Sequence, residues 1–500
     1  RTDTMASGTF VVSRPNDAES THFPLEVQYT VSGATAGVNY EELPLKVTIP
    51  AGAASVEVEV RPIWSGLADK SLNLTLTSKL NYFVGSPGSS TINIKGAPYD
   101  PFVRFVATTG NDSYDGCTDV TAFLTLDRAL AAVSSLDHAT IKVLPGTYVP
   151  TNRLDNYGRY FSHYEITRPV TILGMGSKPE DVHFKSTCTD AGTSKSRVFF
   201  VNNEAAKLKN LLITGGRSGA GNEYPNFGSL GGGGVYLESL GGTVEDCVIS
   251  NCYLSGWNTG GGGIHMWNGR ILRTKFVNNY SGNDRDYDFA GAALCARNGY
   301  VENCLMVNNG KGADNNGYGP VHILGNTVLL NCTIAGNHGK ESAAVVVQGT
   351  SAKVINCAIF NNDVQSDGSG HAGVYYLKNN ATGAQFINCA ADRDIVNGTD
   401  CIMAESGGFV NQVQRDYHLA VASVCRDSAN EDYYLPPFAT SATDLDGIPR
   451  MTGPQRGKQL DIGCYEFDVT ALSIDFYADV TTCLMDYDDG LVPYPARFHA

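Results

Sequence analysis

The chain has 500 residues, more than a single hydrophobic core usually organises, so its length predicts several domains or one elongated repeat body. A hydrophobic content of 42%, with 55 glycines and only 17% charged residues, excludes a disordered chain and favours turn-rich β structure. The formal net charge of -15 argues against nucleic acid as a partner, and no apolar run approaches the ~18 residues that a membrane span needs.

The thirteen cysteines form no CxxC pair and lie beside no histidine at zinc-finger spacing, so no structural metal site is expected. An odd number of cysteines leaves at least one thiol unpaired, unless a segment outside this sequence supplies its partner. The first residues lack the basic and then apolar order of a signal peptide, so the start is expected to be internal to a longer chain.

Short alternating runs fill the first hundred residues. Val56, Val58 and Val60 alternate with acidic residues, and Gly, Pro, Asn and Ser separate this run from others like it. Strands of this kind at regular spacing predict a β-sandwich over residues 1–98.

The stretch GATAGVNYEELPLKVTIPAGAASVEVEV, from Gly33 to Val60, followed by SLNLTLTS, resembles a Calx-beta domain. Members of that family often bind calcium through clustered carboxylates, which suit a hard cation. The resemblance puts Asn39 and Lys70 at two positions that are usually acidic, which leaves Asp69 nearly alone. A calcium ion therefore fits this copy poorly, and the domain is expected to act as a spacer.

Three segments after residue 102 predict the start of a solenoid. VRFVATTGNDSYDG and ATIKVLPGTYV read as strands on either side of TAFLTLDRALAAV, a helix predicted at about residues 122–136. Leu126, Leu130 and Val133 lie on one face of that helix, which would let it close an open hydrophobic end. This order resembles the N-terminal cap of pectate-lyase-like β-helix proteins.

From about residue 208 the sequence repeats one short pattern, as in LKNLLITGG, VEDCVISNC, VENCLMVNN and VINCAIFNN. Successive intervals are 27, 30, 28, 25 and 32 residues, measured at the aligned positions Cys247, Thr274, Cys304, Cys332, Cys357 and Cys389. An apolar residue lies two places after the aligned position, as expected if alternate side chains enter a shared core. We therefore predict an all-β fold built on a right-handed parallel β-helix over residues 99–468, with the length variation in loops.

Asparagine recurs at two positions of the repeat where a turn must close. Stacked coils lie about 4.8 Å apart, so equivalent amides can hydrogen-bond along the stack and satisfy buried backbone groups. We expect a structural role for these residues, which are Asn303, Asn331, Asn356 and Asn388 before the aligned position and Asn279, Asn309, Asn337 and Asn362 after it. The aligned cysteines are expected to be packed thiols rather than nucleophiles.

The segment from about residue 414 to 468, DYHLAVASVCRDSA through KQLDIGCYEF, resembles the terminal segment of choice-of-anchor Q proteins. That family label describes bacterial surface or secreted proteins, which implies an extracellular or cell-surface location. The resemblance places Cys425 and Cys464 on neighbouring strands, which implies a disulfide. Residues 469–500, which begin LSIDFYADV, resemble the start of an incomplete PKD-like β-sandwich, so the parent chain is expected to continue.

The aligned repeats put aromatic, acidic and basic residues side by side on one outward surface. One column holds Tyr236, His265 and His322, and the next holds Glu238, Trp267 and Arg297. Loops along the same edge add aromatic faces for sugar rings, and acceptors for hydroxyls or a cation, at Trp257, Tyr287, Asp284 and Asp286. Together these residues form the predicted ligand-binding site, and a long polymer suits so long a surface.

Two kinds of catalysis are compatible with these residues. Hydrolysis needs two carboxylates about 5 to 10 Å apart across a glycosidic bond, for which the candidates are Glu238 with one of Asp284, Asp286 or Asp288. β-Elimination needs a base beside an acidic sugar, for which the candidates are Tyr236, His265, Arg297 and His322. The paired-Asp, Gly-His-Gly and Arg-x-Lys signatures of polygalacturonase-type hydrolases are absent from the coils.

Three interpretations of the surface stay open: ordinary solvated side chains, binding without catalysis, and a lyase or hydrolase. The leading hypothesis is a secreted or cell-surface modular protein whose β-helix binds extracellular polysaccharide or mediates adhesion. Other surface proteins, or further copies of the chain, are additional candidate partners. The alternative is a carbohydrate-active enzyme that acts in a groove along the β-helix.

Overall fold

The computed structural model describes residues 7–467 except 64–68, 80, 96–98, 151–161, 188–196, 219–230, 256–259, 283–289, 311–318, 340–343, 365–373, 379, 383–384, 434–441 and 451–459. The predicted PKD-like segment, residues 469–500, lies outside this range. The fold is all-β apart from α1 (Ala18–Thr21), α2 (Leu126–Ala132) and short 3-10 turns, as far as these residues show. Neither helix is long or apolar enough to cross a membrane.

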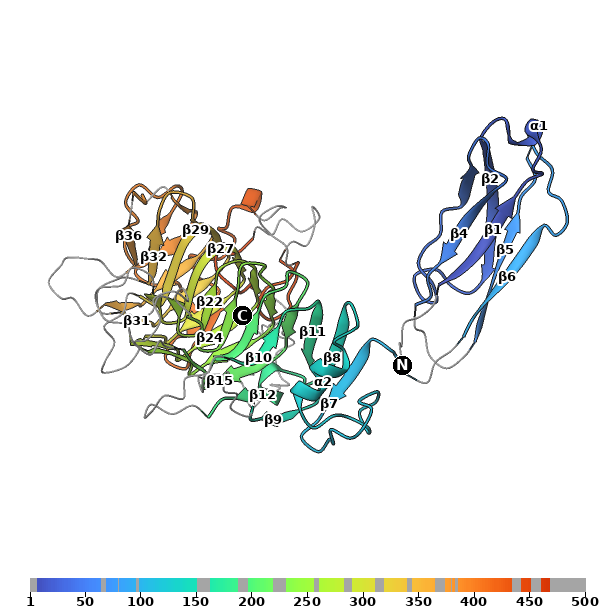
Figure 1. Ribbon diagram of the computed structural model, residues 1–500. Coiled ribbons are helices and arrows are strands. Elements are labelled where there is room, and N and C mark those ends of the chain that lie inside the picture. Colours follow the sequence, from blue (N-terminus) through green and yellow to red (C-terminus); the bar gives the residue numbers. More distant parts are fainter. Residues whose placement is uncertain are drawn as a thin grey trace, which may run out of the picture.

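The N-terminal residues form two antiparallel sheets around one core, as predicted, and Figure 1 draws this sandwich in blue. One sheet pairs β1 (Gly8–Ser13) with β4 (Ser55–Val60). The other has the order β3 (Lys46–Ile49), β2 (Leu25–Gly33), β5 (Lys70–Leu76) and β6 (Ser89–Ile94). Alternate side chains such as Phe10, Val27, Val58 and Leu72 enter the core between the sheets, because successive residues of a strand point to opposite faces.

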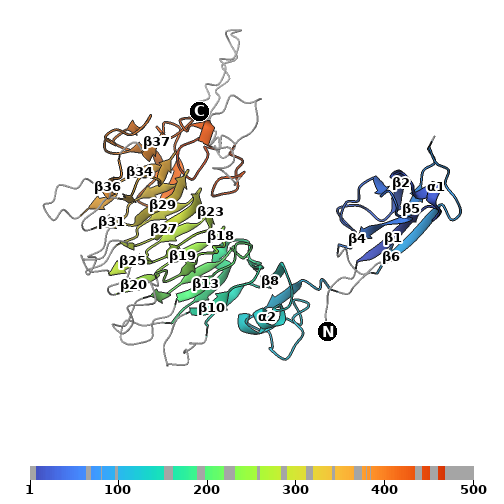
Figure 2. The same ribbon diagram turned by 45° about the horizontal axis from the view of Figure 1, so that its top comes forward.

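From β7 onward the chain winds into coils, and parallel pairing between successive coils builds three long faces (Figures 1 and 2). Face A consists of β10 (Ser162–Ile166), β13 (Arg197–Val201), β17 (Val235–Leu237), β22 (Ile264–Met266), the first halves of β27 (Leu294–Glu302) and β29 (Val321–Leu330), β32 (Val345–Gln348) and β36 (Tyr375–Lys378).

Face B consists of β7 (Val103–Val106), β8 (Ala139–Val143), β11 (Val170–Gly174), β14 (Lys207–Lys209), β18 (Thr243–Glu245), β23 (Arg270–Leu272), the second halves of β27 and β29, β33 (Lys353–Ile355) and β37 (Phe386–Ile387). Face C consists of β9 (Gly146–Tyr148), β12 (Val182–Lys185), β15 (Leu212–Thr214), β19 (Val248–Ser250), β24 (Lys275–Val277), β28 (Leu305–Val307), β30 (Thr333–Ala335), β34 (Ala358–Phe360), β38 (Ala390–Ala391) and β39 (Ile402–Met403). The molecule is therefore the predicted right-handed parallel β-helix.

The core of the β-helix is a set of columns in which equivalent residues of successive coils touch. In face C the parallel register joins Ile213, Ile249, Phe276, Met306 and Ile334, and none of these side chains is exposed. These are the apolar residues two places after the aligned position of the repeat. Each fully buried side chain of this size contributes about 1.5–3 kcal/mol to folding, so the columns supply much of the driving force for winding.

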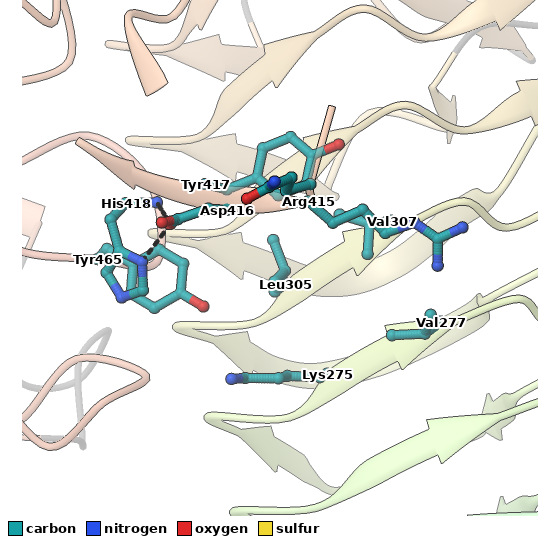
Figure 3. Close-up of a pocket in the computed structure, with 10 residues that line it drawn as sticks. Lys275, Val277, Leu305, Val307, Arg415, Asp416, Tyr417, His418 and Tyr465 are labelled. Carbon is teal, nitrogen blue, oxygen red and sulfur yellow. Dashed lines mark hydrogen bonds and ion pairs between the residues drawn. The ribbon is translucent and has the colours of Figure 1, made fainter. Parts of the chain in front are cut away.

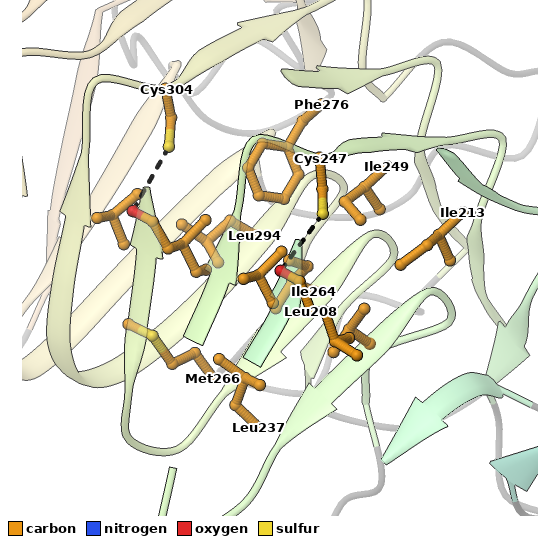
Figure 4. Packing of buried hydrophobic residues seen from close by; sticks show 14 of the residues in the cluster. Leu208, Ile213, Leu237, Cys247, Ile249, Ile264, Met266, Phe276, Leu294 and Cys304 are labelled. Atoms are coloured by element: carbon orange, nitrogen blue, oxygen red, sulfur yellow. Dashed lines mark hydrogen bonds between the residues drawn. The ribbon is translucent and has the colours of Figure 1, made fainter. Parts of the chain in front are cut away.

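From Asp246 onward, the turn from face B to face C uses two equivalent positions in successive coils. The first has a positive φ, as Asp246, Arg273 and Asn303 do, and the second is the aligned Cys or Thr. The Cys304 thiol donates to the carbonyl of Glu302, two residues earlier, at 3.2 Å, and the Thr274 hydroxyl donates to Leu272 in the same way at 2.9 Å. Small side chains that donate one hydrogen bond to the turn therefore occupy this position, and Figure 4 shows two of the cysteines inside the core.

The second set of asparagines forms a ladder along the stack. The side-chain amide of Asn279 donates to Asn309, that of Asn309 to Asn337, and that of Asn337 to Asn362, at 3.0, 3.0 and 2.9 Å. Each acceptor oxygen also takes the backbone N–H of the preceding member, as Asn309 does from Asn279. The ladder satisfies polar groups that would otherwise be buried without a partner, which is the structural role expected from the sequence.

The first set of asparagines acts differently from the expectation. Their positive φ makes the turn, but the amides of Asn303, Asn356 and Asn388 donate to carbonyls of the returning C-terminal segment, at Thr443, Asn430 and Ser428 respectively. Of the four amides in this first set, only that of Asn388 also donates to its neighbour in the stack, Asn356, and that of Asn331 makes no hydrogen bond with the described residues. Asn303, Asn356 and Asn388 therefore hold the C-terminal segment against the coils.

The helix at the N-terminal end is shorter than the predicted range of residues 122–136. α2 begins after Thr125, whose hydroxyl accepts the N–H of Arg128, and ends at Ala132. Residue Phe123 cannot join the helix, because its backbone pairs with Phe105 and Ala107 beside β7. Leu126 and Ala129 are buried in the β-helix core, so the helix contributes to closing this end as expected.

The C-terminal segment folds back over the outer side of face C. Its hairpin of β40 (Phe409–Asn411) and β41 (Asp416–Leu419) shares a hydrophobic cluster with Val307 and Phe360 of the coils. The implied disulfide between Cys425 and Cys464 is wrong for this structure, where both are free and buried thiols. The backbone register explains this, because the carbonyl of Cys425 accepts the N–H of Ile462 rather than facing Cys464.

Candidate functional site

Face A brings the predicted polar residues into two rows. The first row is set by strand pairing, since Tyr236 lies opposite His265, His265 opposite Cys295, and Cys295 opposite His322. The second row holds Glu238, Trp267 and Arg297, which follow directly after the paired residues Leu237, Met266 and Ala296. The alignment of the repeats therefore gave the correct neighbours.

The exposure of the first row differs from the expectation of an accessible surface. Tyr236 is 3% exposed, and His265 and His322 are 0% exposed. The second row is partly exposed at Glu238, Trp267 and Arg297. Position on the outward side of a strand therefore does not by itself give access to solvent, and a ligand can reach the second row and not the first in this structure.

Arg197 belongs to this site, although the sequence did not indicate it. It begins β13, it is 3% exposed, and its guanidinium lies 4.8 Å from the centre of the Tyr236 ring. Burial lowers the pKa of Arg197 to about 10, which still leaves it charged at neutral pH. Arg197 precedes the regular repeats, which begin near residue 208, so no alignment of coils could place it.

The buried row contains titrating groups that are strongly shifted. Burial, followed by the charges of Arg297, Arg197 and His322, lowers the pKa of His265 to about 3, so its imidazole is neutral at physiological pH. Burial and a hydrogen bond with the Glu238 carboxylate raise the pKa of Tyr236. Within the described part of the chain, neither ring nitrogen of His265 has a hydrogen-bond partner.

The other members of the two rows are held by their neighbours. The Nε2 atom of His322 lies 3.0 Å from the Oε1 atom of Gln348 on the next coil. The guanidinium of Arg297 stacks on the Trp267 ring at 4.3 Å from its centre. Burial raises the pKa of Cys295 to about 12, so this thiol is not a thiolate nucleophile.

Four predicted ligand residues, Trp257, Tyr287, Asp284 and Asp286, lie outside the described residues. Across the residues that are described, no group of three His, Cys, Asp or Glu side chains is arranged to hold a metal ion. In the sandwich, Asp69 pairs with Lys95 at 2.6 Å, and the Asn39 amide oxygen accepts the N–H of Thr35. Both residues are therefore engaged within the sandwich itself.

A second site, which the sequence analysis missed, lies between face C and the returning segment (Figure 3). It is an open cavity of about 330 Å³ with Val277, Leu305 and Val307 among its lining residues. Beside it the His418 ring donates to Asp416 and Asp446, at 2.5 and 2.6 Å. Lys275 and Arg415 also line this cavity. They are 140 positions apart in the sequence, so no local sequence pattern could link them.

Thirteen chains of solved structures are similar to this chain, among them the following three. A rhamnogalacturonan lyase is 18% identical, with a TM-score of 0.31, over 58% of this chain and 68% of its own. The rice weevil pectin methyl esterase is 13% identical, with a TM-score of 0.22, over 54% and 68%. The Yersinia enterocolitica family 28 exopolygalacturonase is 11% identical, with a TM-score of 0.20, over 79% and 85%.

No protein-family model matches the sequence. No curated protein matches it either. The fold of this chain is established by its own strand pairing, and the activities named for those three structures are properties of those three proteins.

Proposed function

We propose that this chain is a secreted or cell-surface protein whose β-helix binds an acidic polysaccharide along the second row of face A. The observation that carries the proposal is the Arg297 guanidinium stacked at 4.3 Å on the Trp267 ring, with both side chains partly exposed. The resemblances of its segments to Calx-beta, choice-of-anchor Q and PKD-like modules support a surface location.

The chemistry of the row suits a charged sugar. An aromatic ring offers an apolar face to the C–H groups of a pyranose, and a guanidinium pairs with a carboxylate in a bidentate way. Glu238 adds an acceptor for sugar hydroxyls one coil before Trp267, and coils repeat about every 4.8 Å. The charge of Arg197 beneath the row adds positive potential, because its pKa of about 10, although lowered by burial, still leaves it ionised at neutral pH.

The test is calorimetric binding of polygalacturonate and of its fully methyl-esterified form, which differ in charge but not in backbone. The acidic polymer is expected to bind, and the ester to bind at least about ten-fold more weakly, with further weakening of the acid at 1 M salt. Arg297→Gln and Trp267→Ala should each reduce binding by about ten-fold. Equal binding of both polymers would refute the charge-based interaction.

Arg270→Gln is the matched control for the Arg297 variant. Arg270 also stacks on an aromatic ring, that of Tyr300 at 5.3 Å, but it lies on face B. Its loss should leave binding unchanged. Weakened binding in this variant as well would mean that the polymer follows general surface charge and not the row.

A carbohydrate-active enzyme is the second candidate, because the row of shifted groups next to Glu238 is of the kind found at active sites. Polymer incubated with the chain would be assayed for new reducing ends and for unsaturated-uronate absorbance. Turnover that is lost in Glu238→Gln or His265→Ala would establish the enzyme. Binding without turnover favours the first proposal. In that case, any contact of the chain with other surface proteins or with further copies of itself would serve adhesion.

A further inference from the structure

The cavity between face C and the C-terminal segment has an apolar floor that the fold produces in a simple way. Phe276 and Met306 point into the β-helix, so their neighbours Lys275, Val277, Leu305 and Val307 point outward. The hairpin of β40 and β41 covers the later coils of face C, at Ala335, Ala358 and Phe360. It leaves the strands β24 and β28 beside its edge, and the cavity lies there.

One wall of the cavity is fixed by an ion-paired histidine. The hydrogen bond that His418 donates to Asp446, followed by the one it donates to Asp416, raises the pKa of His418 to about 9, so the ring is an imidazolium at neutral pH. Both ring N–H groups are used by the two carboxylates, and the ring lies 4.1 Å from that of Tyr465. His418 therefore orients the wall but has no N–H left for a ligand.

Two cations at the cavity remain without such partners. Neither the Lys275 ammonium nor the Arg415 guanidinium makes an ion pair with any residue that the structure describes. Lys275 is close enough to Asp446 to help lower the pKa of that carboxyl. In Figure 3 the Lys275 ammonium points to the side of Tyr465, and Arg415 lies at the other end, past Val307.

The site therefore has an apolar floor with five charged groups around it. Three are cations, those of His418, Lys275 and Arg415, and two are carboxylates, those of Asp416 and Asp446. A neutral apolar ligand would leave Lys275 without an ion-pair partner among the described residues, and a cation would be repelled by the excess positive charge. An anion with an apolar body satisfies both features, because its body covers the floor and its charge pairs with a lysine that has lost part of its hydration.

We propose that this cavity binds a small organic anion with an apolar body, of the class of aryl carboxylates. Its carboxylate pairs with Lys275, and its body lies on Val277, the apolar lining residue that is partly exposed. The site is separate from the rows on face A, so it holds whether or not the chain binds polysaccharide.

The experiment uses the full chain and two probes of nearly equal shape, 2-naphthoate and the uncharged 2-naphthalenemethanol. Titration followed by calorimetry should show binding of the acid and at least about ten-fold weaker binding of the alcohol. Lys275→Met, which keeps the apolar stem, should weaken naphthoate by about ten-fold, and Lys275→Arg should restore most of it. Arg415→Gln should have a smaller effect of about two- to five-fold, since that residue is exposed.

Lys185→Met is the control, because Lys185 is an exposed lysine on the same face C, three coils away and outside the cavity. Unchanged thermal unfolding would establish that each variant is folded. The proposal is overturned if acid and alcohol bind alike, if neither binds at millimolar concentration, or if Lys275→Met binds naphthoate as tightly as the parent chain does.

Discussion

The rings of Tyr236 and His265 lie one above the other on adjacent coils, with centres 5.1 Å apart and planes inclined by 37°. This contact places an ionisable ring in a buried aromatic setting beside two guanidinium groups, those of Arg197 and Arg297. The protonated imidazole is disfavoured there by lost hydration and by like charge. A titrating group in this position makes the stability of the fold depend on pH.

His265 is expected to cost stability as the pH falls. Its folded pKa of about 3 lies below the unfolded value of 6.5, so the folded chain binds fewer protons, and the stabilisation is complete above pH 6.5 and lost towards pH 3. His265→Phe keeps a ring against Tyr236 and should reduce the loss of unfolding free energy between pH 7 and 4 by more than about 1 kcal/mol. Urea unfolding at both pH values measures this, and equal losses in parent and variant would contradict it.

His418 is expected to act in the opposite direction. Its folded pKa of about 9 lies above the unfolded value of 6.5, so its stabilisation is complete below pH 6.5 and lost as the pH rises through 9. NMR titration of the ring should give a midpoint near 9 in the parent chain and a lower one in Asp446→Asn, which loses one carboxylate charge. A midpoint at or below 6.5 in the parent would show that the two ion pairs do not form.

The asparagine ladder predicts a strong effect for one amide. Asn309→Ala removes the acceptor of two N–H groups of Asn279 and a donor to Asn337, all buried, and should cost about 2–4 kcal/mol of unfolding free energy. The control is Asn326→Ala, an exposed asparagine of face B, expected within about 0.5 kcal/mol of the parent. Urea unfolding compares them, and similar losses in both variants would remove the special role of the ladder.

The hydrogen bond at the turn position that holds Cys or Thr can be tested by substituting one residue for another there. Thr274→Cys should change the unfolding free energy by less than about 1 kcal/mol, because the thiol can donate to Leu272 as Cys304 does to Glu302. Thr274→Val has nearly the same volume but no donor, and should cost about 1–3 kcal/mol. If valine is tolerated as well as cysteine, the hydrogen bond is not what selects the residue.

The sequence predicted the parts of the fold that repeat. The intervals between the aligned positions predicted the stacked coils. The apolar residue two places after each aligned position predicted the core column of Ile249, Phe276 and Met306. The neighbours Tyr236, His265 and Cys295 followed from the same alignment, because stacking fixes register from one coil to the next.

The remaining features depend on contacts between distant segments, which no periodicity encodes. The burial of His265 and the place of Arg197 beside Tyr236 required the folded chain. The cavity joins Lys275 to a hairpin that returns from far along the chain, and the register of Cys425 against Ile462 decided against a disulfide. The N-terminal boundary of α2 was set by a backbone pairing that overrode helix propensity.

The returning segment has a mechanical consequence. Through Asn303, Asn356 and Asn388 it is fastened to turns of three separate coils, so those coils cannot detach individually from the C-terminal end. Under a pulling force along the axis, separation of neighbouring coils would begin in the earlier coils, to which the returning segment is not hydrogen-bonded in this way. A solenoid fastened in this way transmits tension through its last third as a single unit.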